Sequence, residues 1–427
     1  MGLIGVGTIL LLLPFSHYGT LSWINALFTS TSAVCVTGLI VKDTAANFTH
    51  IGQAIILILI QIGGLGYMTA VTFLAIILNR KLDHKDRLIL KESLNYSRMN
   101  GLVRFLKIVF IFTAIIELAG AIILTLRFWV DMPFLKALWF GIFHSISAFN
   151  NAGFSLFDNN LLNYRSDIVI NIVVPALIIL GGIGYIVLVE LYYYKKYKIL
   201  HLSINTKIVL IVSSFLLILG MVLLLSMEWN GAFRGMPWQD KLLSAWFTSV
   251  NYRTAGFNTI DISSLSNISL FFSTFFMMIG GAPGGTAGGI KVTVVALAFI
   301  GVWYTVRGDT NPHIFHRSIS QYQINKAYSI ILIASLYVVI STVFLSEFEH
   351  LPFIPTLFEA CSAFGTVGLS VGNGGVLSFS AFFNDWGKLN IILLMFMGRV
   401  GVFAFTVAII GKVDKSRIRY PQAKVVL

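Results

Sequence analysis

The chain has 427 residues, of which 57% are hydrophobic and only 11% are charged, and its mean hydropathy is +0.84. No soluble domain of this length has such a composition, so the sequence predicts a protein embedded in a lipid bilayer. The net charge of +12 needs no nucleic-acid partner, because basic loops next to a membrane also attract anionic lipids.

Apolar stretches recur along the chain. A transmembrane helix needs about 20 mainly apolar residues, and the stretches of that length are 51–78, 103–126, 168–192, 207–226, 268–306, 327–346 and 388–411. An eighth stretch, Leu3 to Phe15, is shorter and begins without a basic leader or a small-residue cleavage site. We interpret it as a span that has lost some upstream sequence, in preference to a cleaved signal peptide.

Four similar interruptions divide the chain. They read SAVCVTGLIV around Gly38, SAFNNAGFSL around Gly153, SVNYRTAGFNTI around Gly256 and SAFGTVGLSVG around Gly368. Each follows an apolar stretch of about 12 residues, which is too short to cross a bilayer but long enough for a half-helix, and each precedes a full span. The sequence therefore predicts four repeats of span, half-helix, glycine segment and span, at residues 1–80, 81–195, 196–308 and 309–427, the last with a C-terminal tail.

Charge placement predicts which side of the membrane each connection occupies. The joins between repeats, residues 79–107, 194–208, 307–326 and 412–424, hold 8, 4, 3 and 5 Lys or Arg residues, which is 20 of the chain's 30. The stretches inside the repeats hold 8 basic residues, Arg253 among them, against 10 acidic ones. By the positive-inside rule, the joins and both termini are expected on the cytoplasmic side.

The glycine segments are suited to carry a cation. Non-helical backbone is tolerated at membrane depth only where it is buried in protein or lines a water-filled cavity. Glycine allows neighbouring carbonyl groups to turn toward such a path, and carbonyl oxygens can replace the hydration shell of K⁺. The half-helices would point their partly negative C-terminal ends at the path, which favours cations over anions.

At these motifs the chain resembles the Trk/Ktr/HKT superfamily of potassium transporters, and most closely its bacterial KtrB branch. The resemblance covers nearly the whole chain, with VTGLIV, SAFNNAGFS, RTAGFN and SAFGTVGLS in the expected order. It implies an all-α polytopic membrane protein, with eight transmembrane helices and four pore helices around a pseudo-fourfold pore. By position, the selectivity filter would comprise Val36, Thr37, Gly38, Leu39, Asn151, Ala152, Gly153, Phe154, Thr254, Ala255, Gly256, Phe257, Thr366, Val367, Gly368 and Leu369, with K⁺ at the backbone carbonyls.

The same resemblance implies the ion and the partners. A glycine in all four segments is similar to the potassium-selecting type, whereas relatives with serine in the first segment tend toward sodium. Members of the family form a homodimer seated on a cytoplasmic, KtrA-like ring of nucleotide-binding regulatory subunits. Sodium dependence is reported of the family, but no residue here marks a Na⁺ site, and no covalent cofactor is expected.

A second interruption, GGAPGGTAGGIK at residues 280–291, breaks the last span of the third repeat. So many glycines cannot hold a helix, and the stretch is no phosphate loop because it does not follow a strand. The corresponding family segment is an intramembrane gate, which implies gate residues Gly280, Gly281, Ala282, Pro283, Gly284, Gly285, Thr286, Ala287, Gly288, Gly289, Lys291 and Arg399. A passive kink in the helix is the alternative.

Few charges lie within the predicted spans. Arg399, alone in the last span, needs nearby acceptors, and we expect it to donate hydrogen bonds to the 280–289 loop and to hold the gate shut. The alternatives for Arg399 are repulsion of cations or bracing of the dimer. We expect Glu359 to brace the fourth glycine segment and Glu117 to contact another helix. The glycines of GGLGYMTA (63–70) and GGIGYIVL (181–188) are expected to serve helix packing.

The sequence therefore predicts a passive, potassium-selective subunit in the plasma (inner) membrane. Cytoplasmic stretches are too short for a nucleotide-binding domain, so control would come from a partner. A weakly selective sodium or mixed-cation transporter is the nearest alternative. An intramembrane enzyme is disfavoured, because it would need paired acids or a His/Asp cluster at membrane depth.

Overall fold

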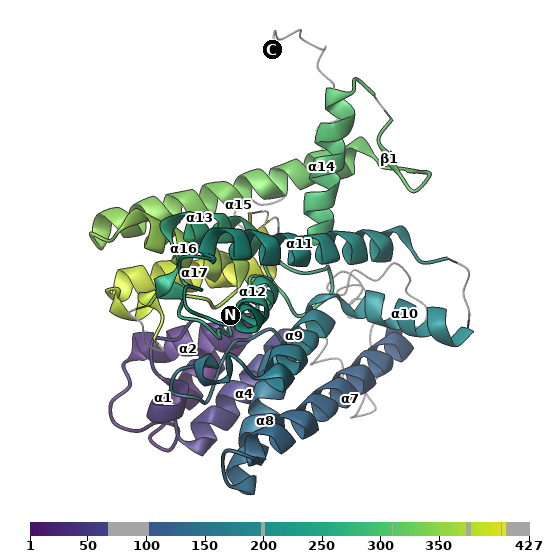
Figure 1. Cartoon of the computed structure of the whole chain (residues 1–427). Coiled ribbons are helices and arrows are strands. Elements are labelled where there is room, and N and C mark those ends of the chain that lie inside the picture. Colours follow the sequence, from purple (N-terminus) through teal and green to yellow (C-terminus); the bar gives the residue numbers. More distant parts are fainter. Residues whose placement is uncertain (67–101, 198–200, 310, 373–376, 403, 407–427) are drawn as a thin grey trace.

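The computed structural model describes residues 1–66, 102–197, 201–309, 311–372, 377–402 and 404–406, and this part of the chain is mostly helical (Figure 1). The α-helices are α1 (Gly2–Leu12), α2 (Trp23–Cys35), α3 (Thr44–Asn47), α4 (His50–Leu65), α7 (Leu102–Trp129), α8 (Phe134–Phe149), α9 (Ile168–Gly182), α10 (Tyr185–Tyr197), α11 (Ile204–Glu228), α12 (Trp238–Asn251), α13 (Asn267–Met278), α14 (Val292–Val306), α15 (Gln321–Phe348), α16 (Phe353–Gly365) and α17 (Asp385–Val400). The remaining elements are the 3-10 turns η1 (Leu162–Tyr164), η2 (Ile262–Ser264) and η3 (Phe379–Phe382), and a hairpin of β1 (His313–Ile314) and β2 (Arg317–Ser318).

Three long apolar helices, α7, α11 and α15, have the length and composition of membrane spans. Helices of 25 to 28 residues are about 40 Å long, which exceeds the ~30 Å hydrocarbon core of a bilayer. At most 33% of the most apolar window of each helix is buried inside the protein. The remaining apolar side chains face outward, as lipid contact requires.

The four half-helices predicted from the sequence are α2, α8, α12 and α16, of 13 to 16 residues. Three of them start directly after a proline, at Pro133, Pro237 and Pro352, and proline is tolerated at a helix start because its missing N–H would have no partner there. All four end at a glycine segment. These helices are about 20 to 24 Å long, so each ends before it could cross a bilayer.

Three of the predicted spans are interrupted. In the stretch 388–411, α17 ends at Val400, and Gly401 after it has a φ of 94°. The stretch 168–192 was expected to form one span, but α9 and α10 meet at an angle of 100° between Gly182 and Tyr185. The break in 268–306 was expected: α13 ends at Met278 and α14 begins at Val292. The second half of the stretch 51–78 lies outside the described residues.

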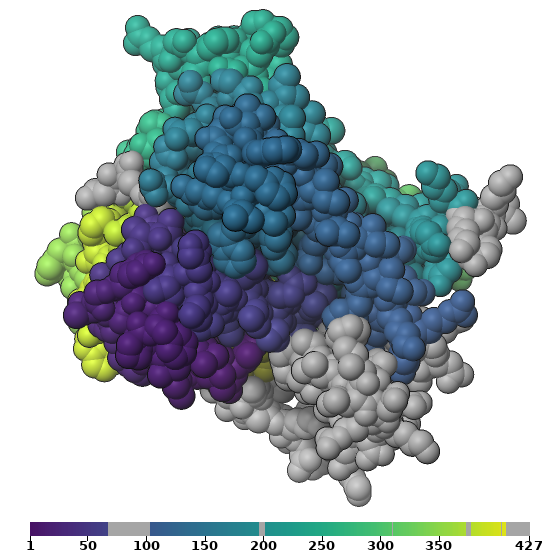
Figure 2. Space-filling model, turned by 90° about the horizontal axis from the view of Figure 1, so that it is seen from below, coloured from purple at the N-terminus to yellow at the C-terminus, as the bar shows by residue number. Residues whose placement is uncertain are grey.

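The helices pack in a cyclic order. The helix that follows each glycine segment packs against the half-helix of the next repeat: α4 on α8, α9 on α12, α13 on α16, and α17 on α2. The last of these contacts joins the first repeat to the last, and Figure 2 shows the purple residues of the first repeat beside the yellow ones of the last. The glycine segments that follow the half-helices are buried inside this arrangement.

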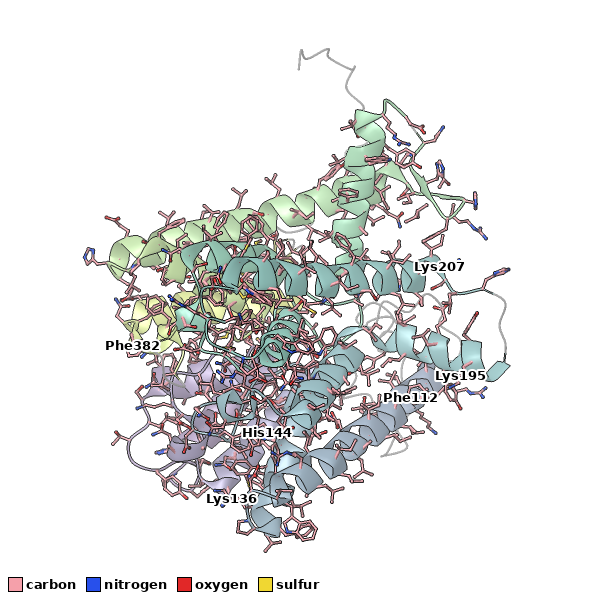
Figure 3. The ribbon with its side chains drawn as sticks, viewed as in Figure 1. Phe112, Lys136, His144, Lys195, Lys207 and Phe382 are labelled. Carbon is pink, nitrogen blue, oxygen red and sulfur yellow. The ribbon has the colours of Figure 1, made fainter. Side chains whose placement is uncertain are left out.

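The connections between repeats and the connections within repeats lie at opposite ends of the molecule. Lys195 and Lys207, at the end of α10 and the start of α11, belong to a join between repeats (Figure 3). Lys136 and Phe382, within repeats, lie at the other end. Most of the basic residues of the first and last joins, in 79–101 and 412–424, lie outside the described residues.

Candidate ion pathway

The four glycine segments, residues 36–39, 151–154, 254–257 and 366–369, share one backbone conformation. The first residue of each has a left-handed φ: 58° at Val36, 58° at Asn151, 72° at Thr254 and 53° at Thr366. The third residue is the glycine, with φ between 70° and 90° in all four segments. A left-handed conformation at a non-glycine residue costs about 1–2 kcal/mol, so the surrounding contacts must hold these four residues in place.

The glycines at the third positions, Gly38, Gly153, Gly256 and Gly368, form a closed cycle and are called the ring glycines below. A Cβ atom on any of them would lie too close to a carbonyl oxygen of the next segment in chain order, and the fourth segment meets the first. The distances are 2.4 Å to Ala152 O, 2.6 Å to Ala255 O, 2.8 Å to Val367 O and 2.2 Å to Thr37 O. The backbones of the four segments therefore meet around one centre that leaves no room for side chains.

Polar side chains of the half-helices hold the segments from behind. Ser32 Oγ accepts a hydrogen bond from Gly38 N and Ser362 Oγ from Gly368 N, both at 3.1 Å. In the third repeat Asn251 Oδ1 accepts from Phe257 N at 2.9 Å. In the second, Ser147 Oγ donates to Phe154 O at 2.8 Å. These residues were not predicted from the sequence, although each precedes its partner by six or seven positions.

His144 and Glu359 occupy equivalent places in the second and fourth repeats, nine residues before a ring glycine. His144 Nε2 lies 3.0 Å from Ser155 Oγ, and Glu359 Oε2 accepts from Ser370 Oγ at 2.6 Å. Glu359 also accepts from the backbone N–H of Ser380 at 3.0 Å. Glu359 thus contacts Ser370, the residue after the fourth segment, as its expected bracing role requires, whereas His144, which Figure 3 shows inside the molecule, was not predicted from the sequence.

The two asparagines where α8 meets the second segment have separate roles. Asn150 Nδ2 donates to Gln61 Oε1 at 2.8 Å and to Glu117 Oε1 at 3.0 Å, which gives Glu117 the contact with another helix that the sequence predicted. Asn151 Nδ2 instead donates to the backbone carbonyl of Arg253 at 3.3 Å. Asn150 therefore anchors the segment to α4 and α7, and Asn151 links it to the third segment.

The 280–289 loop is anchored to the bend between α9 and α10. Ala282 N donates to Gly182 O at 2.9 Å, Thr286 N to Gly181 O at 3.2 Å, and Tyr185 N to Gly284 O at 3.0 Å. The bend leaves the carbonyl groups at the end of α9 and the N–H groups at the start of α10 without the partners that a continuous helix would supply. The loop supplies hydrogen-bond partners for them. The glycines of GGIGYIVL thus do more than the helix packing expected of them. Gly63 does pack closely, because a Cβ there would lie 2.1 Å from Val34 O.

The loop also contacts the glycine segments directly. Thr286 Oγ1 donates to Asn151 Oδ1 at 2.9 Å, and Gly288 N donates to Thr366 Oγ1 at 3.2 Å. Lys291 Nζ donates to the carbonyl of Ala287, inside the loop, at 2.6 Å. The loop therefore lies against the first residues of the second and fourth segments.

Arg399 donates hydrogen bonds to the carbonyl of Thr286 in the loop, as predicted from the sequence. It also donates to Gly63 O and, at 3.1 Å, to Gly64 O at the end of α4, which was not predicted. One guanidinium group thus joins α17, α4 and the loop.

Arg253 is not in the outward-facing stretch to which the charge count assigned it. Its guanidinium donates to Gly280 O at 3.0 Å and to Ser213 O of α11 at 3.4 Å. The count failed because Arg253 directly precedes a glycine segment, and the chain enters the centre of the protein at this point.

Comparison with known proteins agrees with this architecture. The chain is 39% identical over 423 residues to the Ktr system potassium uptake protein B of Bacillus subtilis, covering 98% of this chain and 93% of that protein. It is 36% identical over 435 residues to the potassium/sodium uptake protein NtpJ of Enterococcus hirae, covering 100% and 94%. The crystal structure of the potassium transporter TrkH from Vibrio parahaemolyticus has the same fold, with a TM-score of 0.72 at 18% identity over 91% of this chain and 78% of that one.

These relatives are cation transporters and not enzymes. The model of the cation transport protein family TrkH matches residues 3–418. The chain therefore belongs to the TrkH family of cation transport proteins.

Proposed function

We propose that the chain is the potassium-selective, ion-translocating subunit of a Ktr-type potassium uptake system. The closed cycle of ring glycines carries this proposal, because their close contacts bring four backbones, and no side chains, around one centre. The filter residues of the four glycine segments would hold dehydrated K⁺ with their carbonyl oxygens. The residues of these segments carry no ionisable side chain, so selectivity would come from carbonyl geometry.

The proposed architecture is eight transmembrane helices in four repeats around a pseudo-fourfold pore. The cyclic packing of α4, α9, α13 and α17 on successive half-helices supports it. The half-helices α2, α8, α12 and α16 end at the ring, so their C-terminal dipoles favour a cation there. The basic joins between repeats support cytoplasmic termini in the plasma membrane.

The 280–289 loop, with Lys291 and Arg399, is the proposed gate. Its contacts with Asn151 and Thr366 hold it against the glycine segments, where it would block an ion leaving the ring. These contacts favour a gate over a passive kink, because a kink in α13 and α14 alone would need no bonds to the second and fourth repeats. Arg399 would hold the closed position.

The proposed partners are a second copy of the chain and a cytoplasmic nucleotide-binding ring. The name of the Bacillus subtilis relative, which describes a protein of a Ktr system, supports a partner subunit. Copurification with a nucleotide-binding subunit, followed by mass determination in detergent, tests both partners. A monomer that transports K⁺ at full rate without any partner would refute this part.

Flux into proteoliposomes tests the central proposal. Purified full-length chain should conduct K⁺ at least about tenfold faster than Na⁺, because backbone carbonyls compensate K⁺ dehydration better. The second candidate is a mixed potassium and sodium pathway, which the relative from Enterococcus hirae favours. Equal K⁺ and Na⁺ fluxes would support that candidate, and no cation flux from folded protein would refute both.

A further inference from the structure

Arg253 lies between the third glycine segment and the loop. It directly precedes Thr254, the left-handed residue that opens the segment. Its side chain leaves the segment and donates to Gly280 O, the first residue of the loop. Both ion pairs within the described residues belong to Arg127, so Arg253 is held there by backbone carbonyls and not by a carboxylate.

The backbone of Arg253 closes a circuit of hydrogen bonds. Its carbonyl accepts from Asn151 Nδ2 at 3.3 Å, and Asn151 Oδ1 accepts from Thr286 Oγ1 at 2.9 Å. Thr286 lies in the loop, which leads back to Gly280 and to the Arg253 guanidinium at 3.0 Å. The loop is thus bonded at two places to one junction between the second and third glycine segments. It cannot move away without breaking one of these bonds or pulling on the junction.

Arg399 differs from Arg253 in what it connects. It joins the loop to α4 and α17 through Thr286 O, Gly63 O and Gly64 O, and none of these acceptors belongs to a glycine segment. Arg253 joins the loop to the third glycine segment, because it is the residue directly before that segment. The two arginines therefore attach the loop to different parts of the protein. Arg399 attaches it to helices around the pathway, and Arg253 attaches it to the pathway itself.

We propose that Arg253 is a positioning residue that couples the loop to the ring, so that the position of the loop sets the ion preference of the third segment. This rests on the proposed function, in which the ring selects and the loop gates. In the coupled arrangement a displaced loop pulls on Arg253 and Asn151, and the carbonyls of the ring lose their fit to K⁺. Gating and selectivity then change together.

A double-mutant cycle tests the coupling. Full-length Arg253→Gln, Thr286→Val and the double variant are compared in proteoliposomes by their K⁺/Na⁺ flux ratio. Thr286→Val removes the hydroxyl bond to Asn151 and keeps the backbone carbonyl that Arg399 uses. Arg234→Gln, which removes a charge from an exposed arginine, is the matched control and should leave the ratio unchanged.

Each single variant should lower the K⁺/Na⁺ ratio about tenfold, the scale of one charge-assisted or buried hydrogen bond, and the double variant should lower it little further. Arg253→Lys, which keeps the charge and a donor, should recover part of the ratio and serves in the same cycle if Arg253→Gln does not fold. If the fold-change of the double variant equals the product of the two single fold-changes, the two residues act independently and the coupling is overturned. An unchanged K⁺/Na⁺ ratio in the Arg253 variants would also overturn it. An unchanged ratio in Gly256→Ala would instead count against the ring as the filter.

Discussion

Replacement of Arg399 by alanine is expected to open the pathway. Arg399 bonds the loop through Thr286 O and bonds α4 through Gly63 O and Gly64 O. The substitution removes all three bonds, but only the first holds the loop directly. A hydrogen bond from a charged donor stabilises by about 1.5–3 kcal/mol, so its loss should raise the ratio of open to closed loop roughly 10- to 150-fold.

Potassium flux into proteoliposomes without the regulatory partner measures this effect. We expect Arg399→Ala to raise the flux about tenfold or more, and Arg399→Lys, which keeps a charged donor, to raise it less. Lys388→Ala is the matched control, since Lys388 lies on the same helix and donates to Asn25 Oδ1 of α2 at 3.2 Å, away from the loop. It should leave the flux unchanged.

Deletion of residues 281–288 completes the test. A Cβ on Gly280 would lie 3.4 Å from Gly289 Cα, so the two ends of the loop are close enough to be joined. The deletion should raise flux as Arg399→Ala does, and Arg399→Ala should add little to it. Lower flux in Arg399→Ala, with folded protein and unchanged K⁺/Na⁺ selectivity, would refute the latch.

Further predictions concern the ring and its supports. Serine at any ring glycine should reduce the K⁺/Na⁺ flux ratio, because its Cβ would lie under 3 Å from the next backbone and the φ of the glycine is positive. Gly5→Ser, on the exposed side of α1 where a Cβ has no neighbour within 4 Å, is the control. Unchanged selectivity in all four ring variants would disprove the filter assignment. Saturating K⁺, at about 100 times its dissociation constant, should stabilise the folded protein by about 2.7 kcal/mol in thermal unfolding, and Gly256→Ser should lose most of this increment. Glu359→Ala leaves the Ser380 N–H without its acceptor and should cost about 1–3 kcal/mol of stability, while a melting temperature like that of the unaltered chain would show that Glu359 does not brace the fourth segment.

Local sequence determined much of the pathway. The half-length of α2, α8, α12 and α16 is visible as apolar stretches that end at glycine, since helix formation and helix breaking depend on neighbouring residues. The break between α13 and α14 could also be predicted, because its glycines and proline disfavour a helix locally. The contact of Arg399 with the loop could be predicted because a lone guanidinium in a span needs carbonyl acceptors. The loop was the expected neighbouring segment with unpaired carbonyl groups.

Only the tertiary structure decided which backbones meet. The 100° bend at Gly182 depends on the loop of the third repeat, whose N–H groups satisfy the carbonyls at the end of α9. Charge counting along the chain placed Arg253 outside, because it cannot show that a glycine segment turns back into the protein. The side chains that support the ring, such as Ser32 and His144, contact residues 6 and 11 positions away, but only after the chain turns at the glycine segment, so their role depends on that turn and not on residue type alone.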